Sequence, residues 1–473
     1  MHSLGIDALI LFNAVLAIYF LAGIGGYGAL MMSSWISVWL HKRRHSLETL
    51  QKLRESPAAP PVTIVMPAWN EQEVIVDAVR GALGIDYPGI QVCVVDDGSS
   101  DETLERLVAA FDLTPVNLIA RQWLRTRPVR AFYVNSRFPQ LLVLSKENGG
   151  KSDALNAGLN TCRTPYFCTL DADCILERDA ILRLMRRIVS DPVNIAASGG
   201  TVRVLNGCTV KEGQVTKVNL PRTALERFQV VEYLRSFLFG RTGWSRLGGT
   251  LIISGAFALF HRETVVEAGG FSSDTVTEDM ELIIRLRRWS SGHGRVLRTA
   301  FSSDPVCWVV CPHSRRMLGR QRRRWQLGLC QTLWKNRKMF FDTAFGSFGW
   351  LSLPFHALVE AMGAVVEAAG YLVIPFVAWL DPALLMFLLP LLLFSLAYSA
   401  LLSVAALVLE ELTHRRYGAV RQFLTLLPYA LLENFGYRQL VLCYRVAGVV
   451  RFLRGFRGWE KVVHVSPADL AAD

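Results

Sequence analysis

Long apolar stretches at the two ends of the chain enclose a middle part in which short apolar runs recur. Residues 4–40 are almost wholly apolar, with one charge at Asp7, and they exceed the ~20 residues that a helix needs to span a membrane. We therefore predict a transmembrane anchor over residues 1–41, tilted or with an interfacial end. A cleaved signal peptide is disfavoured, because no basic residue precedes the run and the run is longer than a signal core.

The middle of the chain predicts an α/β domain over residues 58–312 with a mostly parallel sheet. Runs rich in Val, Ile and Leu alternate with helical patterns, as expected of parallel strands with helices on both faces. The predicted strands are Val62–Ala68, Gln91–Asp96, Gln140–Ser145 and Tyr166–Leu170. The predicted helices lie near Glu71–Leu83, Asp101–Phe111 and Ser152–Asn160. The Arg-rich stretch Arg121–Arg137 is expected to be a solvated insertion.

From about Phe345 the chain becomes apolar again, after a basic segment over residues 313–346 that we expect to form interfacial helices. Phe348–Leu380 and Leu384–Leu409 are each long enough to cross a membrane. We predict two transmembrane helices within residues 347–410, joined by a turn at Asp381-Pro382 on the outer side.

Residues 411–473 mix apolar and charged positions. Glu433, Arg438 and Arg445 interrupt the apolar pattern of Phe423–Val450, and a third C-terminal span would place the basic end of the chain outside. We predict a re-entrant or interfacial segment followed by a basic cytosolic tail.

Composition and charge support a membrane protein. Hydrophobic residues make up 51% of the chain, the mean hydropathy is +0.29 and the net charge is +11. The basic cluster at residues 41–44 indicates, by the positive-inside rule, that the α/β domain faces the cytosol. We expect a multi-pass protein of the plasma membrane or bacterial inner membrane, in contact with membrane lipids. Nucleic acid is not expected as a partner, because the chain carries no DNA- or RNA-binding motif.

Two carboxylates follow the last predicted strand. Asp171 and Asp173 alternate directly after Tyr166–Leu170, so the turn from strand to loop brings them close together. Hard cations prefer oxygen ligands and retain substrate phosphate as a ligand, so the pair predicts a site for Mg²⁺ or Mn²⁺. A solvated turn with capping aspartates is the alternative for an isolated pair.

Other polar groups also follow predicted strands. Asn70 and Glu71 come after the first strand, and Asp96-Asp97-Gly98 end the second. Parallel sheets bind ligands beyond the carboxyl ends of their strands, so these groups and the aspartate pair should line one cleft. Asp97 could accept a hydrogen bond from a nucleoside base. Lys151 follows two glycines at a helix start, where phosphate or a donor sugar could bind.

Two further motifs lie later in the chain. Thr277-Glu278-Asp279 opens a predicted helix, where acidic residues are ordinary partners of the helix dipole or, for Asp279, a general base. Ser254 on the preceding predicted strand could line the same pocket. In Gln321-Arg322-Arg323-Arg324-Trp325, Arg324 suits a diphosphate and Trp325 suits stacking on a sugar ring. The alternative for this basic helix is binding of lipid headgroups, which we expect of at least some of its other arginines.

Together these motifs resemble those of membrane-bound family 2 inverting glycosyltransferases, such as cellulose, hyaluronan, chitin and poly-N-acetylglucosamine synthases. The resemblance runs from about Val62 to Trp325 and implies a nucleotide-diphospho-sugar-transferase (GT-A) fold in the cytosolic domain. It implies nucleotide-sugar binding by Asn70, Glu71, Asp97, Lys151, Asp171, Gln321 and Arg324. It further implies metal binding by Asp171 and Asp173, catalysis by Asp279, and acceptor binding by Trp325, Ser254 and Glu278.

The expected function is therefore transfer from a nucleotide-sugar, which the resemblance implies is a UDP-sugar, to extend and secrete a polysaccharide. The alternative is addition of one sugar to a lipid-linked or short carbohydrate acceptor. The predicted spans are fewer than in cellulose synthase, which favours a homodimer or an accessory secretion subunit. A catalytically silent scaffold is disfavoured, because every motif retains its carboxylates.

Overall fold

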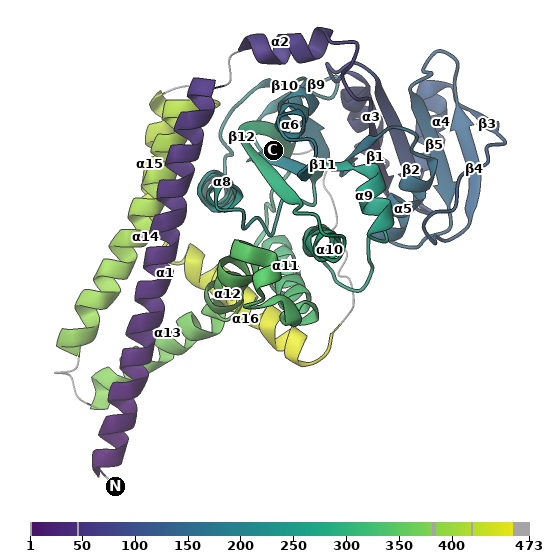
Figure 1. Ribbon diagram of the computed structural model, residues 1–473. Helices are drawn as coiled ribbons and strands as arrows, with labels where there is room; N and C mark the ends of the chain where they lie inside the picture. The colour runs from purple at the N-terminus through teal and green to yellow at the C-terminus, as the bar shows by residue number, and fades with distance from the viewer. Residues whose placement is uncertain (1, 45–46, 381–384, 418–419, 457–473) are drawn as a thin grey trace.

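The computed structural model describes residues 2–44, 47–380, 385–417 and 420–456. A single large sheet forms the centre of the α/β domain (Figure 1). Its strands are β1 (Val62–Ala68), β2 (Ile90–Asp96), β3 (Thr114–Val116), β4 (Val129–Val134), β5 (Leu141–Lys146), β6 (Tyr166–Leu170), β7 (Cys174–Leu176), β8 (Ile195–Val204), β11 (Phe257–His261) and β12 (Arg298–Val309). Their order in the sheet is β3-β4-β5-β2-β1-β6-β11-β8-β12-β7. A separate hairpin pairs β9 (Thr209–Lys211) with β10 (Gln214–Lys217).

The four central strands β5-β2-β1-β6 are parallel, which confirms the predicted fold class. β1 pairs in register with both neighbours, Val62 lying opposite Ile90 in β2 and opposite Tyr166 in β6. The strands are almost wholly buried, because their Val, Ile and Leu side chains face helices on both sides of the sheet. Further along, β11 runs antiparallel to both β6 and β8, and β12 again runs parallel to β8.

Helices cover both faces of this sheet. They are α3 (Ile75–Leu83), α4 (Thr103–Phe111), α5 (Lys151–Thr161), α6 (Ala180–Val189), α9 (Arg262–Glu267) and α10 (Glu278–Gly292), and α2 (Leu47–Glu55) packs on α6. The amphipathic pattern of α6 is typical: Ile181, Leu184 and Ile188 are buried, while the partly exposed Arg183 pairs with Asp179.

The expectation of a solvated insertion at Arg121–Arg137 was wrong in part. β4 lies within this stretch and pairs antiparallel with β5. Arginines at 121, 125, 127 and 130 obscure the strand pattern of Val129–Val134, whose Phe132 is buried against the sheet core. The sequence around β4 therefore has the charge of a loop but the backbone pairing of a strand that lies between β3 and β5.

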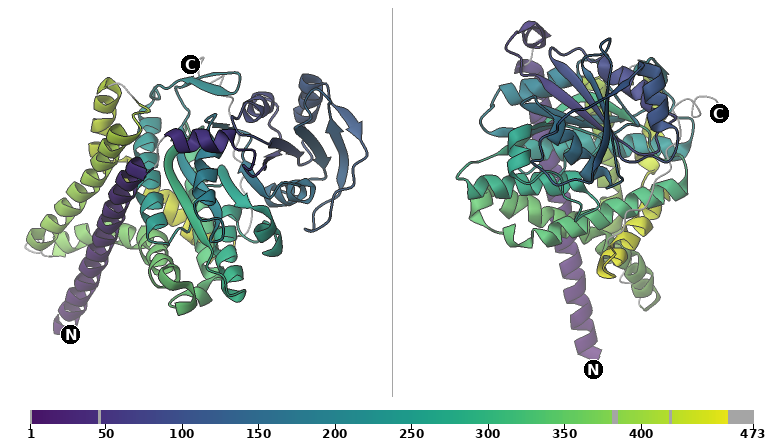
Figure 2. Two further views of the ribbon diagram at one scale, coloured as in Figure 1. Left: turned by 45° about the horizontal axis from the view of Figure 1, so that its top comes forward. Right: turned by 90° about the vertical axis from the view of Figure 1, so that its right-hand side faces the viewer.

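Long apolar helices lie along one flank of the α/β domain. α1 (His2–Arg44) runs beside α14 (Leu385–Thr413), which in turn packs on α15 (Val420–Leu432) (Figure 1). Figure 2 shows the N-terminal end of α1 extending away from the rest of the molecule. Within the described residues, three helical stretches are long and apolar enough to cross a membrane: Ile18–His41, Phe348–Val373 and Leu392–Thr413.

The second of these stretches is a chain of short helical pieces. The π-helices η4 (Phe348–Ser352) and η5 (His356–Ala361) flank α12 (Leu353–Phe355), and α13 (Gly363–Leu380) continues the run. The predicted outer turn at Asp381-Pro382 and the predicted tail over residues 457–473 lie outside the described residues. Glu433–Gly436 separate α15 from α16 (Tyr437–Leu453), so the predicted Phe423–Val450 segment consists of two helices. Its re-entrant or interfacial placement stays a prediction.

The remaining helices connect the flank to the sheet. α7 (Ala224–Leu234), the π-helix η1 (Arg235–Arg241) and α8 (Thr242–Arg246) pack against α1 and α14. α11 (Arg315–Lys335) is followed by the 3₁₀ turns η2 (Arg337–Met339) and η3 (Thr343–Phe345) and packs along α16. This packing is close: a Cβ at Gly448 of α16 would lie 2.9 Å from the Arg323 carbonyl oxygen of α11.

A buried ion pair joins the sheet to the apolar flank. Arg203 of β8 and Glu410 of α14 form a salt bridge with side chains 1% and 4% exposed. Removing one partner of such a pair leaves an uncompensated buried charge and typically destabilises a protein by about 3–5 kcal/mol.

We therefore expect Glu410→Ala to lower the free energy of unfolding by about 3 kcal/mol. Its neighbour Glu411 contacts Arg415 in a surface pair at 4.0 Å, so Glu411→Ala should change stability by less than about 0.5 kcal/mol. Thermal unfolding of the two variants in the same detergent compares them. Equal transition temperatures would show that the Arg203–Glu410 pair does not hold α14 to the sheet.

Candidate active site

One cavity of about 1340 Å³ opens at the carboxyl ends of β1, β2 and β6. The sheet order explains its position, because parallel neighbours deliver the loops after these strands to one edge. The starts of α5 and α10 and residues 317–329 of α11 close the same space. All the sequence-predicted site residues line it: Asn70, Glu71, Asp97, Lys151, Asp171, Asp173, Ser254, Glu278, Asp279, Gln321, Arg324 and Trp325.

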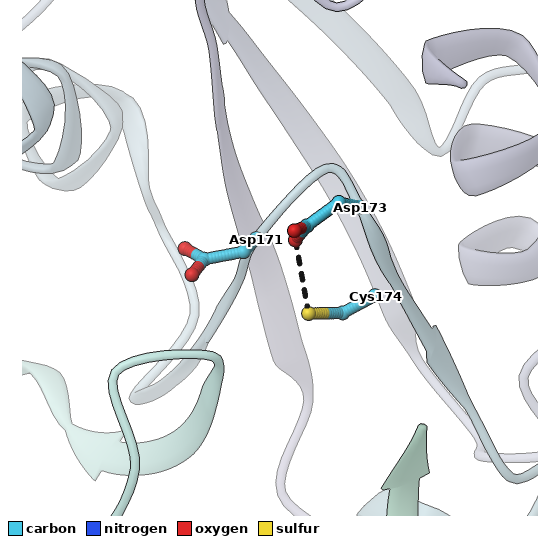
Figure 3. A group of neighbouring side chains, drawn as sticks. All are labelled: Asp171, Asp173 and Cys174. Carbon is cyan, nitrogen blue, oxygen red and sulfur yellow. Dashed lines mark hydrogen bonds between the residues drawn. The ribbon is translucent and has the colours of Figure 1, made fainter. Parts of the chain in front are cut away.

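The aspartate pair lies in the tight loop between β6 and β7. The Cys174 amide donates a hydrogen bond to the Asp171 carbonyl oxygen (3.1 Å), which turns the chain and brings the two carboxylates together. Ligand atoms of Asp171, Asp173 and Cys174 lie within 4.8 Å of one another (Figure 3). The Cys174 thiol donates to the Asp173 carboxylate (3.2 Å). A hydrogen bond with Cys307 and burial hold the pKa of this thiol well above its usual range, so it stays protonated.

The donor set therefore fits a hard divalent cation. The two available ligands are carboxylates, which Mg²⁺ and Mn²⁺ prefer. Burial raises the pKa of Asp171, while nearby Lys151 opposes that rise. The close pair of carboxylates thus carries an unfavourable charge concentration that a bound cation would relieve.

Lys151 lies at the centre of the acidic groups. Its Nζ contacts Asp171 (2.6 Å) and Glu278 (3.1 Å) and donates to the Gly255 carbonyl oxygen (3.2 Å). Burial alone would lower the pKa of this amine, but the two carboxylates outweigh burial and raise it. Lys151 thus remains charged and ties the start of α5 to the start of α10.

Asp279 occupies the first turn of α10, next to Glu278. A Cβ at Gly255 would lie 3.2 Å from Asp279 Oδ2, so the absence of a side chain at Gly255 leaves room for this carboxylate. Burial and the charge of Glu278 raise the pKa of Asp279, while Lys151 and Arg241 act in the opposite direction. Burial would also raise the pKa of Glu278, but Lys151 outweighs it and the pKa is lowered. The pKa values of the two neighbouring carboxylates therefore shift in opposite directions, up for Asp279 and down for Glu278. Active sites use such differences to give two carboxylates different roles.

Asp97 holds the neighbouring loop. Its carboxylate accepts hydrogen bonds from the amides of Gly149 (3.0 Å) and Gly150 (2.7 Å) and from Lys146 Nζ (2.6 Å). The glycine after it, Gly98, has φ +67° and approaches the backbone of Asn148. The absence of a side chain at Gly98 leaves room for the Lys146 carbonyl oxygen and the Asn148 backbone.

Asn70 fixes the loop after β1 to the loop after β2. It adopts φ +57°, a left-handed conformation that Asn tolerates better than most residues. The Asn70 side-chain Oδ1 accepts a hydrogen bond from the Ser100 backbone amide (2.8 Å). The Asn70 backbone amide donates to Ser99 Oγ (3.0 Å). The Glu71 amide donates to Thr103 Oγ1 (2.8 Å). These bonds hold two strand-end loops together at the rim of the cavity.

α11 carries the last motif to the opposite wall. The helix packs closely on the start of α10: a Cβ at Gly328 would clash with Thr277. Gln331 Oε1 also accepts a hydrogen bond from the Val276 amide (3.1 Å). Trp325 is 39% exposed, and among the described residues the buried Gln321 Oε1 has no hydrogen-bond partner. Arg322, one of the arginines of this helix for which headgroup binding is the alternative, is buried and paired with Glu232 of α7 (2.7 Å).

Two protein-family models match the sequence of this chain. A model described as "Glycosyl transferase family 2" matches residues 63–266. A model described as "Glycosyl transferase family group 2" matches residues 166–405, just over half of the chain. The chain is a family 2 glycosyltransferase.

Curated relatives include the poly-beta-1,6-N-acetyl-D-glucosamine synthases of Staphylococcus aureus strain COL and Staphylococcus epidermidis. They are 27% identical over 282 residues and 24% identical over 267 residues. The matches cover 60% and 56% of this glycosyltransferase but 57% and 54% of the relatives, so the similarity spans just over half of their length. Among solved structures, a mannosyltransferase from Pyrobaculum calidifontis, determined with GDP-Man and Mn²⁺, has a TM-score of 0.50 at 19% identity. It covers 93% of this chain and 99% of its own, and this likeness supports the fold alone.

The structure corrects one placement in the glycosyltransferase and adds residues to the site. Ser254 lines the cavity as expected but lies in the loop before β11, not on a strand. Cys174 could have been noticed from its position beside Asp173. Arg241 and Glu232 also line the cavity, but no motif marks them, because η1 and α7 reach the site through tertiary packing.

We expect Asp279→Asn to reduce transfer by the glycosyltransferase by ~10²-fold or more while UDP affinity stays within about twofold. Protonation of Asp279 would remove the base, so the rate of the wild-type enzyme should fall as the pH is lowered. Because the pKa of Asp279 is raised, this fall should occur at a pH above 3.8, the ordinary pKa of an Asp. Initial rates and UDP titrations measure both effects. Asp274→Asn is the control, since Asp274 pairs with Lys335 at the surface. Loss of UDP affinity in Asp279→Asn would instead assign Asp279 a structural role.

Proposed function

We propose that this glycosyltransferase is membrane-embedded and inverting, and that it uses a UDP-sugar to extend a polysaccharide held partly among its membrane helices. The observation that carries the proposal is the continuity of the cavity. The same space that contains Asp171 and Asp279 passes Trp325 and continues between α1, η5, α13, α14 and α16. An acceptor chain bound at the reaction centre could therefore leave along this path.

The deep end of the cavity has the polar character that a carbohydrate requires. Tyr27 donates to Glu360 at 2.5 Å, Arg445 lies 3.5 Å from the same carboxylate, and Arg438 contacts Glu367 (2.8 Å). Charged groups among membrane helices are costly and usually face a polar interior or pathway. Tyr19, Tyr398 and Ser399 line the same region, and their rings and hydroxyls suit stacking and hydrogen bonding to sugars.

The chemistry would be a single displacement. The acceptor hydroxyl oxygen attacks the anomeric carbon of the donor sugar, and Asp279 accepts the hydroxyl proton. The bond from that carbon to the diphosphate oxygen breaks, and its electron pair leaves with the nucleoside diphosphate. One displacement inverts the anomeric configuration, which is consistent with one carboxylate acting as base.

Asp171 and Asp173 would hold the Mg²⁺ or Mn²⁺ ion, which would supply positive charge beside the leaving diphosphate. Lys151 and Arg324, which line the cavity with them, would add fixed positive charge there. Asn70, Glu71 and the loop held by Asp97 would surround the nucleoside, and Gln321 would contact the diphosphate or the end of the acceptor. Ser254 and Glu278 would line the acceptor side.

The proposed location is the plasma or inner membrane, with the α/β domain in the cytosol. Three apolar helices of sufficient length support this location. Trp334, Phe341 and Trp350, each more than half exposed, lie just before or within the second candidate span, as aromatic residues do at membrane interfaces. A second copy of the chain or an accessory subunit would complete secretion on the outer side.

A single-sugar transferase acting on a lipid-linked or short acceptor is the second candidate. The observation that favours it is the contact of the cavity with the apolar helices themselves, through Phe20, Ile24 and Leu402. Such a lining would accommodate a lipid-linked acceptor as well as a polymer.

Incubation of the purified glycosyltransferase with labelled UDP-glucose, UDP-N-acetylglucosamine or GDP-mannose, with Mg²⁺ or Mn²⁺, tests the proposal. A ladder of products from one UDP-sugar is expected. We predict that Trp325→Ala shortens this ladder while UDP affinity stays within about twofold, because sugar stacking on the indole contributes on the order of 1 kcal/mol. Trp379→Ala, at an exposed site distant in sequence from the motif, is the control. A single product would favour the second candidate, and no turnover of any donor would contradict both.

A further inference from the structure

The indole of Trp325 carries a charged partner on one face. The Arg322 guanidinium carbon lies 4.3 Å from the centre of the Trp325 ring, a distance at which a cation is attracted by the ring's π electrons. The two residues are three apart on α11, so helical geometry places them on one side of the helix. Arg322 is 3% exposed, whereas Trp325 is 39% exposed, and both line the cavity.

Two other elements fix the position of this guanidinium. Arg322 Nη2 donates to Glu232 of α7 at 2.7 Å. The Tyr437 hydroxyl, at the start of α16, donates to the same Glu232 oxygen. The Tyr437 ring in turn stacks on Phe228 of α7, with ring centres 5.0 Å apart and planes 12° apart. Glu232 of α7 thus holds Arg322 of α11 and Tyr437 of α16 through the same carboxylate oxygen.

Two nitrogens of the Arg322 guanidinium group are buried without a hydrogen-bond partner among the described residues. Within the described part of the chain, its Nε and Nη1 have no hydrogen-bond partner. A buried arginine that only stabilised the fold would be expected to direct these groups at carbonyl or carboxylate oxygens. Here the planar group lies against an aromatic ring instead, with one edge held by Glu232.

We propose that Arg322 is a positioning residue for the acceptor: anchored by Glu232 and Tyr437, it holds the Trp325 indole in the orientation that receives a sugar ring. The inference rests on the proposed function, in which Trp325 binds the acceptor. It adds that the orientation of Trp325 depends on α7 and α16, and hence on contacts between the α/β domain and the membrane-associated helices.

Arg322→Lys separates stacking from charge. Lysine keeps the positive charge and can reach Glu232, but it lacks the planar group that stacks on the indole. We expect Arg322→Lys to reduce mean product length on the order of three- to tenfold, the range expected for loss of a desolvated cation–π contact. UDP affinity and the thermal transition should remain close to those of the wild type.

Arg337→Lys is the matched control. Arg337 lies 4.9 Å from the ring centre of Trp334 in a similar stack outside the cavity, so product length should not change. Tyr437→Phe is a second test of the anchor. It retains the ring that stacks on Phe228 and removes the hydroxyl that contacts Glu232, and it should also shorten the product.

A double-mutant cycle with Trp325→Ala decides whether Arg322 acts through Trp325. If it does, Arg322→Lys should have less than about a twofold effect on product length in the Trp325→Ala background. Equal effects in both backgrounds would show an independent structural role and overturn the inference. Unchanged product length in Arg322→Lys, with a shortened product in Trp325→Ala, would overturn the inference but leave the proposed function intact. An unaltered product in Trp325→Ala would overturn both.

Discussion

The repulsion among carboxylates gathered in one cavity is the constraint on which the site depends. Asp171, Asp173, Glu278 and Asp279 all line the space at the edge of the sheet. Like charges that share one cavity repel each other, and burial adds the free-energy cost of removing them from water. The chain offsets part of this cost with Lys151, which contacts both Asp171 and Glu278. The uneven compensation leaves Asp279 with a raised pKa and Glu278 with a lowered one. The carboxylates of Asp171 and Asp173 lie close enough together to fit a divalent cation, as proposed above.

The sequence predicted the centre of this arrangement because parallel strands obey simple rules. β1 and β6 have the predicted bounds, and the polar residues after them face one cavity as the carboxyl-end rule requires. α10 begins at Glu278, as its acidic first turn indicated. In each case a local pattern was enough, since buried runs of Val, Ile and Leu mark the strands and the polar residues after each run mark its carboxyl end.

Tertiary contacts account for what the sequence could not predict. β4 is charged enough to resemble a loop, and it is its pairing with β3 and β5 that makes it a strand. Arg322 looks like every other arginine of its basic helix until Glu232, 90 residues earlier in the chain, is placed beside it. The extension of the cavity among α1, α13, α14 and α16 likewise depends on how four distant segments pack. Hydropathy identifies such helices as apolar, but it does not show which of their faces line a common polar space.

Photo-crosslinking of the growing product tests most directly whether the acceptor passes through that space. A photoreactive amino acid at Ser395, which lines the cavity from α14, would be compared with one at Leu393, which is 56% exposed and does not line it. Labelled sugar donor and a divalent cation would be supplied before illumination. The account predicts that labelled carbohydrate is captured at position 395 and not at position 393, and that capture requires synthesis. Absence of carbohydrate at position 395 during active synthesis would contradict it.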